Sequence, residues 1–126
     1  MATAEVSVQA QYEKLTDEYR KVQTDLQSFV EARQKLEGQL QENKIVQKEF
    51  SILEDDSKIY KLIGPVLVPQ DRTEAVMNVD KRLEFIESEI KRIEGQITAT
   101  RTKSDKKRAE VLAFQTQIQD KGRPAA

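Results

Sequence analysis

Two runs of charged residues are the places where this chain could do chemistry. Glu54, Asp55 and Asp56 follow one another, and adjacent carboxylates can bind a divalent cation or act as general acid and base. A basic run further on has the pattern of a nucleic-acid contact or a nuclear localisation signal; its residues are Arg101, Lys103, Lys106, Lys107 and Arg108, interrupted by Asp105. Each run also has a plainer interpretation, as the end of a helix and as a solvated helix face.

The rest of the chain supplies none of the groups that these chemistries need. Its 126 residues include no His and no Cys, so there is no imidazole base, no thiol nucleophile and no soft ligand for zinc or an iron–sulfur cluster. There is no glycine-rich phosphate loop. The basic run has no interleaved aromatics, and 21 basic residues stand against 22 acidic ones. We therefore expect no enzyme, no catalytic or metal site, no cofactor and no nucleic-acid partner.

The composition is that of long helices. Charged residues make up 34% of the chain and apolar residues 37%, with only four Gly and three Pro, which is typical of coiled coil. No apolar run approaches the roughly 18–20 residues of a membrane span. Residues 1–11 lack the basic start and apolar stretch of a signal peptide, and the lack of Cys fits a reducing compartment. We expect a soluble, intracellular chain without a membrane partner.

Two long segments repeat apolar residues at alternating spacings of three and four, which is strong evidence for a coiled coil. Nine of twelve positions in the first series are apolar, and ten of fourteen in the second. The first series is Tyr12, Leu15, Tyr19, Val22, Leu26, Phe29, Arg33, Leu36, Leu40, Asn43, Gln47 and Phe50. The second is Val76, Val79, Leu83, Ile86, Ile90, Ile93, Ile97, Thr100, Ser104, Lys107, Val111, Phe114, Ile118 and Lys121.

Between these segments lie two short runs of β-branched and apolar residues on either side of Gly64-Pro65. They predict two strands joined by a tight turn or by a slightly longer, bulged loop. Folding the chain there places Leu15 opposite Phe114, with a displacement of about three residues allowed in antiparallel packing. Asp71 or Thr73 would cap the second helix. We predict a single, mainly α domain over residues 1–126: an antiparallel two-helix coiled coil with helices over 5–56 and 72–121, a β-hairpin over 57–70 and a disordered tail over 122–126.

The hairpin is not expected to be stable in a lone chain. A two-stranded ribbon is marginal in water, and this one is apolar on both faces. The neighbouring helix ends carry further apolar residues outside the seam, namely Ile45, Val46, Ile52, Leu53, Met77 and Phe85. We therefore predict assembly with other subunits through a composite sheet, using Ile59, Tyr60, Leu62, Ile63, Val66, Leu67 and Val68.

The sequence also resembles the β-type subunits of eukaryotic prefoldin. The resemblance is carried by Arg33–Glu37, Gln39-Leu40, Glu42-Asn43, Ile45-Val46, Tyr60–Val68, Lys81–Leu83 and Glu89–Arg92. It implies a heterohexamer of two α-type and four β-type subunits, whose strands form a double β-barrel body from which coiled-coil arms extend. It further implies an ATP-independent holdase that captures unfolded chains, notably actin and tubulin, and delivers them to the cytosolic chaperonin.

The helix ends opposite the hairpin are the predicted client-binding site. Frayed helix ends with separable apolar residues can hold non-native chains, which offer apolar surface without a fixed shape. The candidates are Val8, Tyr12, Leu15, Tyr19, Val111, Leu112, Phe114 and Ile118, of which Leu112 lies off the seam and should be exposed. The alternative is that these residues simply close the coiled coil, and the alternative for the whole chain is a structural tether or scaffold without affinity for unfolded protein.

One stretch of the second seam is polar. Thr100, Ser104 and Lys107 interrupt it, either as a soft zone that lets the helix ends separate or as a device that fixes the helix register.

Overall fold

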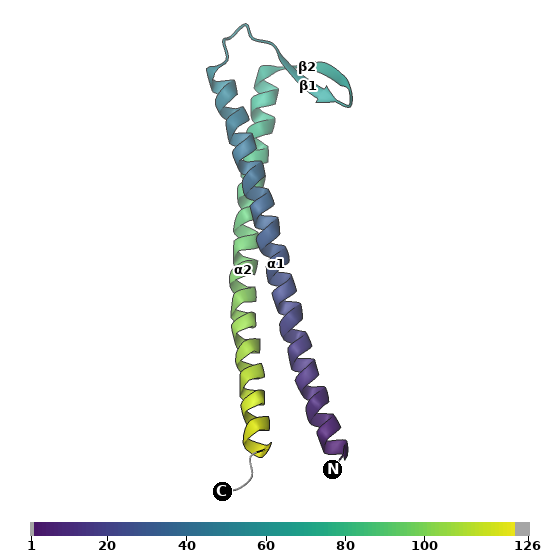
Figure 1. Cartoon of the computed structure of the whole chain (residues 1–126). Coiled ribbons are helices and arrows are strands. Elements are labelled where there is room, and N and C mark those ends of the chain that lie inside the picture. The colour runs from purple at the N-terminus through teal and green to yellow at the C-terminus, as the bar shows by residue number, and fades with distance from the viewer. Residues whose placement is uncertain (1, 123–126) are drawn as a thin grey trace. The chain divides into compact units, whose positions relative to one another are not determined.

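The structure, a computed structural model, describes residues 2–122, and their side chains over 7–121. It contains two long helices with a short antiparallel β-hairpin between them, as the sequence predicts (Figure 1). In chain order the elements are α1 (Ala2–Ile52), β1 (Ile59–Ile63), β2 (Val66–Gln70) and α2 (Arg72–Gly122).

The helix boundaries differ from the predicted ones. Helix α1 begins at Ala2 instead of residue 5, and it ends at Ile52 instead of residue 56. The acidic run lies past the helix in a turn, in which the Ser57 amide donates to the Glu54 carbonyl at 3.0 Å. Helix α2 extends to Gly122, the first residue of the predicted tail; residues 123–126 lie outside the described part of the chain.

Arg72 explains why α1 ends where it does. Its guanidinium donates to the carbonyl oxygens of Phe50 at 3.1 Å, Leu53 at 2.9 Å and Glu54 at 2.9 Å. Carbonyls at a helix C-terminus have no partner within the helix, so the first residue of α2 satisfies one carbonyl in the last turn of α1 and two in the turn that follows it. Asp55 lies 3.7 Å from the same guanidinium.

Asp71 is the N-cap of α2. Its carboxylate accepts a hydrogen bond from the Glu74 amide at 3.2 Å, and its carbonyl accepts one from the Ala75 amide at 2.9 Å. The side chain therefore satisfies one of the unpaired amides of the first turn, which decides between the two predicted caps.

The hairpin closes through a tight turn. Leu62 pairs with Leu67 and Ile63 with Val66, which leaves Gly64 and Pro65 as the two loop residues. Gly64 has a φ of +59°, as the first central residue of a type II′ turn requires, and that turn fits the twist of antiparallel strands.

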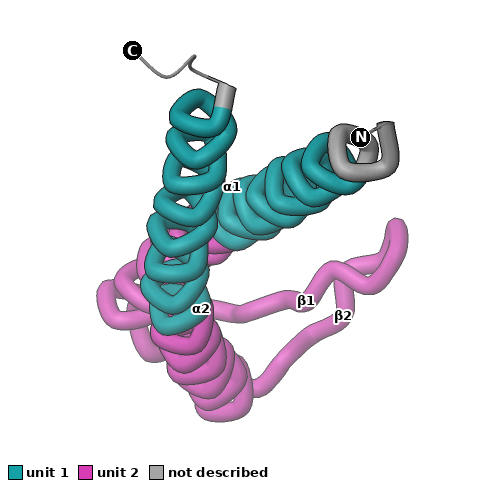
Figure 2. The backbone as a smooth tube through the Cα atoms, turned by 90° about the horizontal axis from the view of Figure 1, so that it is seen from below, with its two compact units in different colours: residues 1–31, 94–126 teal, residues 32–93 magenta. Residues whose placement is uncertain are grey.

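The chain divides into two compact units (Figure 2). Unit 1 comprises residues 1–31 and 94–126, and unit 2 comprises residues 32–93. In each unit a segment of α1 packs against a segment of α2 along the predicted seam. Among the side chains that the structure describes, the buried ones belong to α2: Ala75, Val79, Leu83, Ile86 and Ile93 in unit 2, and Ile97, Thr100 and Ser104 in unit 1.

Contacts between the helices confirm antiparallel packing and give its register. In unit 1 the rings of Tyr12 and Phe114 stack, with centroids 6.3 Å apart. Tyr12 thus takes the place expected for Leu15, a displacement of about three residues or nearly one helical turn. The cause is an asymmetry around the hairpin, because residues 53–58 join α1 to β1 whereas Asp71 alone joins β2 to α2.

Candidate assembly and client-binding surfaces

The hairpin exposes apolar side chains on both faces. Leu62 and Leu67, which face each other across the strands, are 67% and 62% exposed. Of the seven predicted assembly residues, six are exposed and Ile59 is half-buried. Large apolar patches on a protein surface mark sites of interaction with other proteins.

The apolar surface of unit 2 continues from the hairpin onto the outward faces of its helices. Phe85 is 64% exposed and Ile52 is 73% exposed. The other exposed apolar residues there are Ile45, Val46 and Met77, while Leu53 is half-buried. Together with the hairpin residues they form what we call the assembly surface.

A hollow of about 350 Å³ lies in unit 2 between β1 and the two helices. Four consecutive β1 residues, 59–62, line it. Gln70 of β2, the partner of Ile59, lines it as well. Val46 and Phe50 of α1 and Arg82 of α2 form its other walls. Separately, β1 pairs with β2 along one edge and with no other strand of the described residues, and an unpaired strand edge is a site where a further strand can pair.

The helix ends of unit 1 contain both half-buried and exposed apolar residues. Gln115 donates from Nε2 to the Tyr12 hydroxyl at 2.7 Å, beside the stacked Tyr12 and Phe114 rings. Of the eight predicted client-binding residues, Val8, Leu112 and Ile118 are exposed. Five are half-buried along the seam: Tyr12, Leu15, Tyr19, Val111 and Phe114. The expected exposure of Leu112 is confirmed, at 52%.

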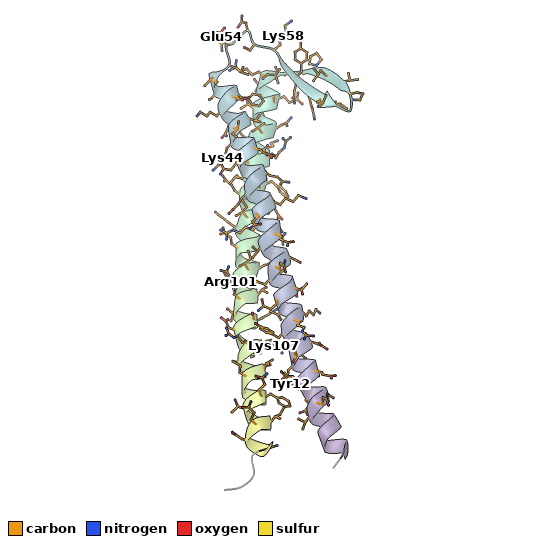
Figure 3. All side chains as sticks on the ribbon, viewed as in Figure 1. Tyr12, Lys44, Glu54, Lys58, Arg101 and Lys107 are labelled. Atoms are coloured by element: carbon orange, nitrogen blue, oxygen red, sulfur yellow. The ribbon has the colours of Figure 1, made fainter. Side chains whose placement is uncertain are left out.

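A polar layer crosses the seam of unit 1. Gln23 donates from Nε2 to the Ser104 hydroxyl at 2.6 Å and to the Tyr19 hydroxyl at 3.0 Å. Lys107 donates to the carboxylates of Glu18 at 2.7 Å and Glu110 at 3.3 Å; Figure 3 labels Lys107 and Tyr12. The sequence predicted the polar seam residues but not Gln23 and Glu18, which lie off the predicted seam of α1. Both partners could have been sought from the sequence, because a hydroxyl or ammonium in a helix seam needs hydrogen-bond partners on the facing helix.

The ion pair between Lys107 and Glu18 perturbs both groups. The hydrogen bond from Lys107 lowers the pKa of Glu18, with partial burial opposing and the attraction of Lys107 and Lys14 adding to it. The hydrogen bond to Glu18 raises the pKa of Lys107. Both groups are therefore charged at neutral pH.

The basic run lies mostly on the exposed face of α2. Arg101, Lys103, Lys106 and Arg108 are exposed on α2. Over the same part of the chain, no group of three His, Cys, Asp or Glu residues could hold a metal ion. Among the helices of residues 2–122, none is long and apolar enough to cross a membrane.

Comparison with known proteins agrees with this architecture. The family described as "Prefoldin subunit" matches residues 8–118. "Prefoldin subunit 6" of Saccharomyces cerevisiae is 52% identical over 99 residues, which cover 79% of this chain and 87% of that protein. The human "Prefoldin subunit 6" is 38% identical over 112 residues, covering 89% and 87%.

Solved structures show the same fold. The crystal structure of the prefoldin beta subunit from Thermococcus strain KS-1 superposes with a TM-score of 0.56 at 25% identity, covering 91% of this chain and 95% of that one. The beta2 subunit from the same strain superposes with a TM-score of 0.63 at 20% identity, over 72% and 97%. The resemblance read from residues 33–92 is confirmed.

Proposed function

This chain belongs to the prefoldin subunit family, and we propose that it works as a β-type subunit of an ATP-independent holdase. Family membership makes it a co-chaperone subunit that assembles with other prefoldin subunits. In the proposed assembly, two α-type and four β-type subunits form a heterohexamer. The hexamer captures unfolded chains such as actin and tubulin and delivers them to the chaperonin of the cytosol. The proposal also holds that the chain works in the cytoplasm and has no enzymatic activity.

The distribution of exposed apolar side chains is the observation that carries the proposal. In unit 2 they form the assembly surface on the hairpin and the adjacent helix faces. In unit 1 they are Val8, Leu112 and Ile118, next to seam residues that are only half-buried. Each apolar side chain that a client covers is worth about 1.5–3 kcal/mol. Weak contacts of this kind add up to useful avidity when several arms hold one client.

The alternative function is a structural tether or scaffold without affinity for unfolded protein. The β-hairpin argues against it, because two antiparallel helices can be joined by a loop of a few residues. The two functions differ in one measurable property, the protection of a denatured client from aggregation.

The test is light scattering from a denatured client in the presence of reconstituted hexamer, with and without ATP. We expect wild-type hexamer to suppress scattering equally in both conditions. A hexamer whose copy of this chain lacks residues 1–14 and 112–126 should still assemble by sedimentation and should protect less well. A finer variant keeps the seam and changes Val8→Ser, Leu112→Ser and Ile118→Ser. Its matched control changes exposed neighbours, Gln9→Ser, Ala113→Ser and Gln117→Ser.

Three outcomes would contradict parts of this proposal. A wild-type hexamer that gives no protection favours the tether. Protection by the truncated hexamer that equals wild type places the client site elsewhere, most naturally on the underside of the barrel body. Hydrolysis of ATP that requires this chain would refute ATP independence.

A further inference from the structure

Two hollows lie along one flank of unit 1. The inner one measures about 460 Å³ and the outer one about 390 Å³. Glu18 lines both, and its ion pair with Lys107 marks the boundary between them. The lining residues on α1 recur at spacings of three and four, which places them on a single face of the helix; they are Gln11, Lys14, Leu15, Glu18, Lys21, Val22, Asp25 and Phe29. We call this flank the lysine groove.

The lysine groove has an apolar floor. Leu15 and Phe114 line the outer hollow, and Val22 and Phe29 line the inner one. All four side chains are half-buried, so they have apolar surface left to cover. From residue 11 to residue 29 the helix rises about 27 Å, which corresponds to about eight residues of extended chain.

The rim of the groove has a surplus of positive charge. Lys107 lies between two carboxylates, those of Glu18 at 2.7 Å and Glu110 at 3.3 Å, and this cluster carries one excess negative charge. Lys21 and Lys103 also line the inner hollow, are exposed, and form no ion pair with any described residue. Lys14 lines the outer hollow. Against these three cations stand the one excess negative charge of the Lys107 cluster and the carboxylate of Asp25, which forms no ion pair with any described residue. The rim therefore keeps one positive charge in excess.

We propose that the lysine groove binds extended client segments in which apolar side chains alternate with Asp or Glu. This inference rests on the proposed holdase function and names the client class within it. The apolar side chains would cover the floor, while the carboxylates would lie beside Lys14, Lys21 and Lys103. Complementary charge speeds encounter and discriminates between partners more than it adds affinity. Segments rich in Lys or Arg would be repelled by the rim.

Site-specific crosslinking tests the proposal, because the chain has no Cys. Ala99 lines the inner hollow, and Arg101 lines neither hollow and lies about 200° further around the helix. Chains carrying Ala99→Cys or Arg101→Cys are coupled to a photoreactive group and then mixed with unlabelled partner subunits to form hexamer. The probes are two synthetic peptides of equal length with the same Leu, Val and Phe residues, which alternate with Glu in one and with Lys in the other.

We expect the Glu peptide to crosslink at position 99 at least about threefold more than at position 101, and more than the Lys peptide at position 99. Charge reversal in the groove, Lys21→Glu with Lys103→Glu, should abolish this preference. The matched reversal Arg101→Glu with Arg108→Glu, combined with Ala99→Cys, changes the net charge equally and should preserve it.

Equal yields at the two positions, or equal yields for the two peptides, would overturn the lysine groove. If the same hexamer still suppresses client aggregation, the proposed function stands and only the groove is wrong. A hexamer that neither crosslinks the peptides nor suppresses aggregation refutes both.

Discussion

The two units use the same helical seam for different purposes. Unit 2 has five buried apolar residues on α2 and places eleven of the fourteen large exposed apolar side chains of the described chain on its surface. Unit 1 buries one apolar residue and two polar ones, Ile97 with Thr100 and Ser104. A well-packed seam next to a large apolar surface suits permanent association, because the surface keeps its shape while a partner covers it. A seam with a polar layer and half-buried ends suits contacts that form and break, since less apolar area holds its helices together.

The largest expected effect is on the assembly surface of unit 2. Leu62→Lys with Leu67→Lys places two charges at one cross-strand pair, where like charges directly opposite destabilise a sheet. We expect incorporation into the hexamer to be abolished, as measured by sedimentation, with helicity largely kept in circular dichroism.

The matched control places the same charges on exposed apolar residues of unit 1, Leu112→Lys with Ile118→Lys. This variant should assemble normally. If the hairpin variant sedimented at wild-type mass, assembly through a composite sheet would be wrong. If both variants failed to assemble, the two units would not differ as we describe.

The next effect concerns the connection between the helices in unit 2. Arg72→Ala removes a hydrogen bond to a carbonyl in the last turn of α1 and hydrogen bonds to two carbonyls in the turn that follows it. Hydrogen bonds to a charged group are worth about 1.5–3 kcal/mol each at most, and the Arg72 side chain is one-third exposed. We therefore expect a loss of about 2 kcal/mol in the free energy of unfolding of the full chain, measured by urea denaturation.

Arg82→Ala provides the comparison, since Arg82 donates one hydrogen bond, to Asn43 at 3.3 Å. Arg82→Ala should lower the free energy of unfolding by less than about 1 kcal/mol. Arg72→Lys should fall between the two, because one ammonium cannot reach all three carbonyls. Equal losses for Arg72→Ala and Arg82→Ala would show that Arg72 does not hold the end of α1.

Much of this architecture could be predicted from residue types and spacing. The three- and four-residue spacing gave the seam, since buried positions must recur once per helical turn. The two-faced apolar hairpin and residues such as Phe85 predicted the exposed apolar surface of unit 2, because apolar side chains without neighbours in their own chain stay uncovered until another chain supplies them.

Other features depend on side-chain reach and could not be read from the pattern. Arg72 stands 18 residues from Glu54, to whose carbonyl it donates, and no periodicity links them. Gln23 and Glu18 supply the partners of the polar layer from positions beside the seam. The helix register differs from the predicted one because the linkers before and after the hairpin differ in length. The spacing of apolar residues does not report the length of a linker.

A smaller effect is expected from the polar layer of unit 1. Thr100 is 8% exposed, lines the inner hollow of the lysine groove, and makes no side-chain hydrogen bond with the described residues. Because this hydroxyl is not among the wholly buried side-chain atoms that lack a partner, Thr100→Val should stabilise the seam by less than about 1 kcal/mol. Thr98→Val is the control, since Thr98 is exposed and its hydroxyl donates to the Glu94 carbonyl.

Amide hydrogen exchange locates the effect of Thr100→Val. If the polar layer is a soft zone, exchange should slow over residues 94–121 and stay unchanged over 75–93, and client protection should weaken. Unchanged exchange together with loss of the contact between Tyr12 and Phe114 would instead indicate that the layer fixes the register.

The smallest effect concerns the pH dependence of unit 1. Since the pKa of Glu18 is lowered in the folded chain, the stabilisation from its carboxylate is complete above the ordinary pKa of 4.5 and is lost as the pH falls through the lowered value. The raised pKa of Lys107 makes its contribution complete below 10.5, and this contribution is lost only as the pH rises through the raised value. The stability of unit 1 should therefore fall in acid and stay constant across neutral pH.

Glu18→Gln should lower the melting temperature of unit 1 slightly at pH 7, and the difference from wild type should vanish in acid. The NMR amide signals of residues 12–23 and 100–115 report this melting. Glu89→Gln is the control, because the pKa of Glu89 is lowered by Arg92 within one helix of unit 2, so its loss should leave the melting of unit 1 unchanged. A difference between Glu18→Gln and wild type that persists below the folded-state pKa of Glu18 would show that the carboxylate acts through packing and not through its charge.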